Sequence, residues 1–151
     1  MQNHSPCEPW ALATVLLVQH DVSDAEELAE SLHEEPYQVY VVTSVPEAMR
    51  VVAAQSIDVV LADQQLEGVH DGEFFRVLEQ SQPSIIRILL GHRKDPGLSG
   101  RLARLGRAHR WIPQPCDHGE LATTLFNALV QRSFLPPESE HALPVPVLSG
   151  K

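Results

Sequence analysis

The sequence predicts an α/β fold, (βα)5, in which a doubly wound parallel five-stranded sheet carries helices on both faces. Apolar runs of strand length alternate regularly with segments of helical period, and five such units fit into about 120 residues, as expected for right-handed β-α-β crossovers. With 151 residues, the chain is long enough for one ordinary domain and too short for two. A hydrophobic content of 43% with 21% charged residues indicates a globular protein.

The predicted strands are short apolar runs, the pattern of parallel strands that are buried on both faces. They are Thr14–Val18, Tyr37–Val42, Ile57–Ala62, Ser84–Leu90 and a short fifth at Ala108–Ile112.

Each strand is followed by a segment with apolar residues at helical spacing. The first, Ser23–Glu34, begins with the capping-box spacing of Ser23 and Glu26 and is ended by Pro36. The other predicted helices are Pro46–Gln55, Asp71–Gln80, Leu98–Leu105 and His118–Arg132. Glycines at 97, 100 and 106 weaken the prediction of the fourth helix.

The ends of the chain lie outside this pattern. Residues 1–11 form a polar N-terminal extension, residues 12–132 the predicted domain, and residues 133–151 a proline-rich tail or linker. Cys7 and Cys116 are isolated, so a disulfide is not expected. The chain shows neither a signal peptide nor a membrane span, and we expect a cytoplasmic protein.

The charge of the chain bears on its partners. A net charge of −9 argues against nucleic acid and anionic membranes as direct partners. The one basic stretch, Arg101–Arg110, holds four spaced arginines. It is either a solvated face or a contact patch for an acidic partner.

Function in such a sheet is expected beyond the carboxyl ends of its strands, where strand order reverses. Several polar groups follow the predicted strands: Gln19-His20-Asp21, Thr43-Ser44, Asp63-Gln64-Gln65, Gly91-His92 and Gln114. Asp63 stands out because it ends a strand expected to be central and doubly buried. The sequence contains no glycine-rich nucleotide loop and no G-x-S-x-G elbow. We expect no metal site, and the one trio that could form one is His20, Asp21 and Asp63.

Four segments, in order, resemble the receiver domain of two-component response regulators. TVLLVQHD is similar to the family's ILLVDDD strand, and IDVVLADQQLEGVHDGEFF to DLVLLDxxLPGMDGxEL, which places Asp63 at the phospho-accepting aspartate. SIIRILLGH and HRWIPQPCDHGEL resemble RILLTGH and YRYLxKPWDxxEL. The resemblance covers about Thr14 to Arg132 and implies a flavodoxin-like (CheY-like) sheet with strand order 2-1-3-4-5.

The departures from the family pattern concern the reactive site. Gln19 and His20 occupy the positions of two carboxylates that help to hold Mg²⁺, and a slip of one residue would pair His20 with Asp21 instead. Gly91 stands at the position of a hydroxyl residue, and Gln114 at that of a lysine. Trp111 matches a switch aromatic, although it could equally be a plain core aromatic.

These losses lead to a functional expectation. Mg²⁺ prefers carboxylate oxygens, and phosphoryl transfer depends on positioned charge, so Mg²⁺ binding and phosphorylation should both be impaired. We therefore expect a pseudo-receiver that acts in phosphorelay signalling by protein contact, with no enzyme activity and no cofactor. One alternative is a receiver still phosphorylated at Asp63, with His20 as a cationic stand-in for the metal. Another is a flavodoxin-like cofactor-binding protein or small enzyme.

The expected partners are a histidine kinase and a downstream output domain or protein. The expected contact face combines Leu98–Leu105, Ala108–Ile112 and His118–Arg132, and the same face could form a homodimer.

Overall fold

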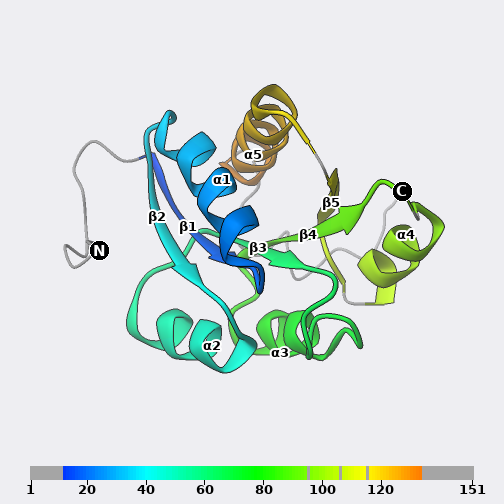
Figure 1. Cartoon of the computed structure of the whole chain (residues 1–151). Helices are drawn as coiled ribbons and strands as arrows, with labels where there is room; N and C mark the ends of the chain where they lie inside the picture. The colour runs from blue at the N-terminus through cyan, green and yellow to red at the C-terminus, as the bar shows by residue number, and fades with distance from the viewer. Residues whose placement is uncertain (1–11, 95, 106, 115, 134–151) are drawn as a thin grey trace, which may run out of the picture.

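Five parallel strands form one sheet in the computed structural model (Figure 1). The structure describes residues 12–94, 96–105, 107–114 and 116–133. The predicted N-terminal extension, and the predicted tail apart from Ser133, lie outside these residues. The strands are β1 (Ala13–Val18), β2 (Tyr37–Val42), β3 (Val59–Asp63), β4 (Ile86–His92) and β5 (Arg110–Gln114).

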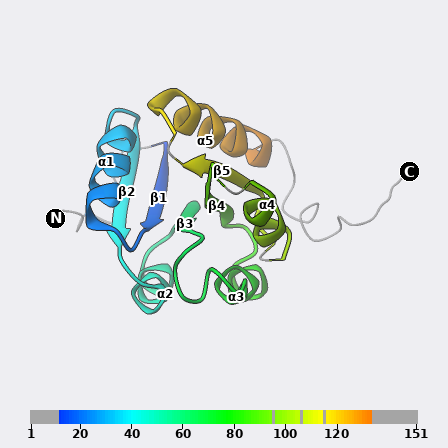
Figure 2. The ribbon, with the colours of Figure 1, turned by 45° about the vertical axis from the view of Figure 1, so that its right-hand side comes forward.

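Five helices alternate with the strands, as predicted. They are α1 (Val22–His33), α2 (Val45–Ala54), α3 (Glu73–Ser81), α4 (Pro96–Leu105) and α5 (His118–Ser133). Ser133 therefore ends α5 and does not belong to the tail. α1 and α5 cover one face of the sheet, and α2, α3 and α4 cover the other (Figure 2).

The strand order is β2-β1-β3-β4-β5, which confirms the order implied by the family resemblance. β1 lies between β2 and β3, and Val18 of β1 pairs with Ala62 of β3. After β1 the chain crosses to β2 on one side, whereas β3, β4 and β5 follow one another on the other side. The strand order thus reverses between β1 and β3, the position where α/β proteins of this kind bind their ligands.

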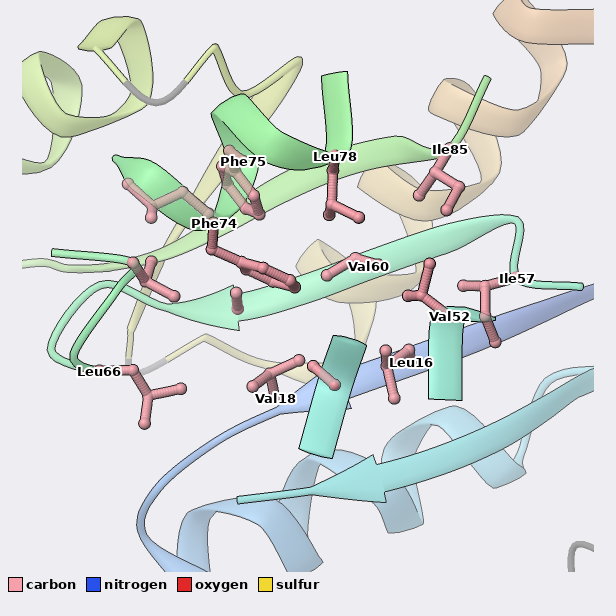
Figure 3. Packing of buried hydrophobic residues seen from close by; sticks show 14 of the residues in the cluster. Leu16, Val18, Val52, Ile57, Val60, Leu66, Phe74, Phe75, Leu78 and Ile85 are labelled. Carbon is pink, nitrogen blue, oxygen red and sulfur yellow. The ribbon is translucent and has the colours of Figure 1, made fainter. Parts of the chain in front are cut away.

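The strands supply apolar side chains to both faces of the sheet, because successive residues of a strand point to opposite sides. Leu16 and Val18 pack in the layer under α2, α3 and α4, whereas Val15 and Leu17 pack under α1 and α5. Figure 3 shows the first of these layers, in which Phe74 of α3 points toward β3.

The start of α1 differs from the prediction. Its N-cap is Asp21, whose Oδ1 accepts a hydrogen bond of 3.0 Å from the backbone N–H of Asp24. The predicted capping box of Ser23 and Glu26 is therefore wrong, because both residues already lie inside the helix. An aspartate one residue before the helix satisfies a free N–H and places negative charge at the positive end of the helix dipole.

The fifth strand lies two residues later than predicted. Arg107 adopts a positive φ of 60°, and the N–H of Ala108 bonds to the carbonyl of Ala103 at 2.8 Å, so this segment still closes the end of α4. β5 consequently begins at Arg110 and includes Pro113. An edge strand accepts a proline because one side of its backbone needs no partner.

Within the described residues, no helix has the length and apolar character needed to cross a membrane.

Candidate functional site

Four strands bring polar residues to the carboxyl edge of the sheet. Gln19 follows β1, and Asp63, His92 and Gln114 are the last residues of β3, β4 and β5. His92 pairs in register with Gln114, and Asp63 with Leu90. The edge predicted from the strand ends is therefore a real cluster in space.

Asp63 is buried at this edge, with 3% of its surface exposed. Its Oδ1 accepts a hydrogen bond of 3.1 Å from the N–H of Gln65 and lies 3.6 Å from Nε2 of His92. The second distance is too long for a hydrogen bond, but the contact is attractive when the imidazole is protonated. His92 is therefore the imidazole that the structure places beside Asp63.

Gln19 is fully buried next to this carboxyl edge. Its backbone N–H bonds to the carbonyl of Val42 at 3.1 Å, while its side-chain oxygen and nitrogen have no hydrogen-bond partner among the described residues. His20 and Asp21 are exposed, and Asp21 caps α1. The structure does not join His20 and Asp21 to Asp63 as a metal site: within the described ranges, no three His, Cys, Asp or Glu side chains group closely enough to hold an ion.

Gly91 lies within β4, one residue before the end of the strand. A Cβ atom at this position would come within 2.6 Å of Oγ and 2.7 Å of Cβ of Ser99, and within 3.0 Å of the Trp111 ring. Trp111 is partly buried against the core layer that contains α4. The space beside Gly91 is therefore filled by a serine from α4 and by the β5 aromatic.

Ser99 makes two hydrogen bonds in this space. It is fully buried, donates to Oε1 of Gln64 at 2.7 Å and accepts from the N–H of His92 at 3.0 Å. Gln64 is also buried, and its own N–H bonds to the carbonyl of Leu90 at 2.9 Å. These bonds connect α4 to the residues that follow β3 and to the end of β4.

A cleft of about 800 Å³ opens above the site, between α1 and the ends of the strands. Gln64, Gln65, His92 and Gln114 lie on the strand side, and α1 with its C-cap contributes a row of carboxylates: Asp24, Glu27, Glu30 and Glu34. The lining includes the two residues that contact the Asp63 carboxylate, but not Asp63 itself.

Cys116 also lines the cleft, just after β5. Burial raises the pKa of its thiol, with further contributions from the carboxylates of Glu120 and Asp117, whereas Arg93 acts in the opposite direction. A raised pKa keeps the thiol protonated and therefore a poor nucleophile.

The family model of the response regulator receiver domain matches residues 15–126, which include most of β1 and all of the other four strands. The chain belongs to the response regulator receiver family. Receiver domains act in two-component signalling, where they interact with histidine kinases and output domains.

A relative identified by sequence agrees with this assignment. The chain is 32% identical over 83 residues to the hydrogenase transcriptional regulatory protein HoxA of Cupriavidus necator, a match that covers 55% of this chain and 17% of that protein. The chain thus spans about a sixth of the length of this relative.

Solved receiver structures share the fold. One is the signal receiver domain of an HD domain-containing protein from Pseudomonas fluorescens Pf-5, with 25% identity, a TM-score of 0.72, and coverage of 80% of this chain and 97% of that one. Another is a receiver domain protein from Clostridium thermocellum, with 21% identity, a TM-score of 0.73, and coverage of 83% and 100%. These matches show that the chain has the fold of receiver domains.

The receiver family implies a Mg²⁺ ion beside the acceptor aspartate, and the donors in this chain do not fit it. Mg²⁺ requires several hard oxygen ligands in octahedral geometry, usually carboxylates. Here Asp63 is the one buried carboxylate among the described strand-end residues, and the groups that contact it are the backbone N–H of Gln65 and the imidazole of His92.

Sequence reasoning found the strand-end residues but not their contacts. It named Gln64 and His92 without giving them a role, and it did not consider Ser99. The contact of His92 with Asp63 follows from the pairing of β3 with β4, whereas the position of Ser99 depends on how α4 packs on the sheet. No local pattern in the sequence predicts how α4 packs on the sheet.

Proposed function

We propose that this receiver is a pseudo-receiver, which signals through protein contacts without Mg²⁺-dependent phosphorylation of Asp63. The observation that carries the proposal is the set of neighbours around Asp63. Gln65 and His92 contact the carboxylate, and Gln64 follows it in the chain. Gln19 and Gln114 lie at the ends of β1 and β5. Carboxylates, a hydroxyl and a lysine would support phosphoryl transfer at this edge.

The physical argument concerns charge. Phosphoryl transfer is accelerated mainly by positioning and by electrostatic stabilisation of the transferred group. Neutral amides replace a metal ion and a lysine cation here, and each such charged group typically contributes roughly 10²-fold or more to the rate. Their combined loss leaves Asp63 without the groups that activate it.

The test is treatment with acetyl phosphate, or with beryllofluoride, in the presence of Mg²⁺. We expect no phosphoryl adduct by intact-protein mass spectrometry and no change in backbone amide shifts near Asp63 and Trp111. A Trp10→Phe variant leaves Trp111 as the only tryptophan of the chain's two, so its fluorescence provides a second readout.

A restored variant supplies the positive control. Gln19→Asp, His20→Asp and Gln114→Lys together return two carboxylates and the lysine to the site, and we expect this variant to bind Mg²⁺ more tightly than the native chain. An adduct on the native chain that disappears in Asp63→Asn would overturn the proposal.

One observation favours the alternative that Asp63 is still phosphorylated by altered chemistry. His92 lies 3.6 Å from the Asp63 carboxylate, so a protonated imidazole could offset negative charge in place of a metal. The earlier expectation gave this part to His20, which is exposed. Under this alternative, an adduct forms with acetyl phosphate without Mg²⁺ and is lost in His92→Ala.

The surface of α4, β5 and α5 is the proposed contact face for a kinase, an output domain or a second copy of the chain. Arg101 and Arg104 are exposed on α4. The other two arginines are engaged within the molecule, because Arg107 pairs with Glu79 at 3.1 Å and Arg110 bonds to Gln131. Because the net charge of the chain is −9, we propose protein partners rather than nucleic acid or membranes.

A further inference from the structure

We propose that the buried Ser99 hydroxyl fastens α4 to the ends of β3 and β4, so that the α4 surface is held in one arrangement that does not depend on chemistry at Asp63. This inference deepens the proposed function, since it says which residues hold the contact face of a receiver that lacks the usual reactive groups.

The first support is steric. Ser99 occupies the space beside Gly91, where even a single added carbon would approach Oγ and Cβ of Ser99 to 2.6 and 2.7 Å. Such distances require atoms to shift, because protein interiors are close-packed. A side chain at position 91 and the observed position of Ser99 therefore exclude each other.

The second support is hydrogen bonding. The Ser99 hydroxyl uses its donor on Gln64 at 2.7 Å and an acceptor site on the His92 N–H at 3.0 Å. Ser99 and Gln64 are both buried, so moving α4 outward would leave polar groups unpaired in the interior. The arrangement resists displacement because of that penalty.

The third support is the route of the connection. Gln64 directly follows Asp63, and its backbone N–H also bonds to Leu90 of β4 at 2.9 Å. The hydroxyl thus joins the segment after β3, the end of β4 and the first turn of α4. None of these bonds uses the Asp63 carboxylate, which instead contacts Gln65 and His92.

The test compares Ser99→Ala with the native chain by amide hydrogen exchange and by NMR, without any phosphate donor. We expect the His92 amide to exchange about tenfold faster in Ser99→Ala, since it loses its acceptor in the interior. The amide shifts of Arg101, Leu102 and Ala103 should change in the same variant. Arg101→Ala, which alters an exposed side chain on the same helix, should leave the His92 exchange rate unchanged.

Two further variants make the result decisive. Asp63→Asn should leave the α4 shifts at their native values, and Ser99→Ala combined with Gln64→Leu should accelerate exchange no more than the stronger single change, because both remove the same connection. The proposal is overturned if His92 exchange is unaffected in Ser99→Ala, or if Asp63→Asn moves the α4 resonances as far as Ser99→Ala does. Phosphorylation of the native chain would contradict the proposed function but would not alter these exchange rates.

Discussion

His109 shows how one residue makes stability depend on pH. Desolvation, followed by the positive charges of Arg87 and Arg110, lowers its pKa to about 4 from the usual 6.5, and its Nδ1 accepts a 2.9 Å hydrogen bond from the N–H of Arg87. Between these two values the unfolded chain binds a proton that the folded chain does not. This contribution to stability is therefore complete above about pH 6.5 and is lost as the pH falls toward 4.

His109→Asn should remove that pH dependence, because an asparagine oxygen can accept the same bond without titrating. We expect the free energies of unfolding of variant and native chain, measured by urea titration, to converge as the pH falls from 6.5 to 4. The effect should be modest, since the ring is partly open to solvent. His70→Asn, at an exposed position, is the control, and an equal effect there would refute the assignment to His109.

Gly91→Ala tests the close packing beside β4. The new methyl group would meet Ser99 and Trp111, and overpacking of this kind typically costs about 1–3 kcal/mol. Gly100→Ala provides the comparison, since nothing lies within 4 Å of a Cβ there and alanine favours a helix by up to about 1 kcal/mol. The free energy of unfolding, measured by chemical denaturation, should thus fall in Gly91→Ala and rise in Gly100→Ala. An unchanged value in Gly91→Ala would contradict the close packing beside β4.

The positions of the functional residues could be predicted better than the contacts that these residues make. Asp63, Gln19 and Gln114 all lie at the predicted edge, because polar residues after an apolar run mark the end of a strand, and the carboxyl ends of parallel strands meet at one edge of the sheet. The contacts at this edge were harder to predict, since His92 reaches Asp63 from the neighbouring strand and Ser99 reaches His92 from a helix. The functional roles given to these positions remain predictions.

At the scale of elements, the cap of α1 can be tested directly. Asp21→Ala removes the carboxylate that accepts the Asp24 N–H, and we expect a loss of about 0.5–2 kcal/mol in the free energy of unfolding. Ser23→Ala, inside the helix and exposed, should cost much less. Thermal and urea unfolding of both variants measure the difference. A larger loss of unfolding free energy in Ser23→Ala than in Asp21→Ala would support the capping box of Ser23 and Glu26 and contradict the cap seen in the structure.

The kinds and the number of elements could be predicted from period alone, whereas several boundaries could not. α3 begins at Glu73, two residues later than predicted, because Gly72 adopts a left-handed φ of 81° before the helix. α4 begins at Pro96, earlier than predicted, since proline is well tolerated in the first turn of a helix. Both differences depend on backbone conformation at a single residue, which hydrophobic period does not report.

At the scale of the whole molecule, stability and binding depend on different side chains. Phe74 is buried under α3, and Phe74→Ala should cost about 3–5 kcal/mol of unfolding free energy. Arg104 is exposed on α4, in the proposed contact face, and Arg104→Ala should change stability by no more than about 0.5 kcal/mol. If the face is used, Arg104→Ala weakens self-association in sedimentation or partner capture by a candidate kinase. Unchanged association in both assays would argue against this face.

The architecture of the whole sheet was largely accessible from the sequence. Alternating strands and helices predicted a parallel sheet, and the family resemblance added the strand order that the structure shows. What the sequence could not supply was the way α4 closes against β4 and β5, because that packing is set by side chains far apart in the chain. The contacts of Ser99 with Gln64 and His92 arise from that packing.

The contact between Gly91 and Ser99 also couples the two positions in any substitution. A residue with a side chain at position 91 requires the side chain at position 99 to move or to be replaced. Either change alone is costly: one creates a clash, and the other leaves Gln64 and the His92 N–H without their partner. A stable chain with a hydroxyl residue at position 91 therefore requires two coordinated substitutions.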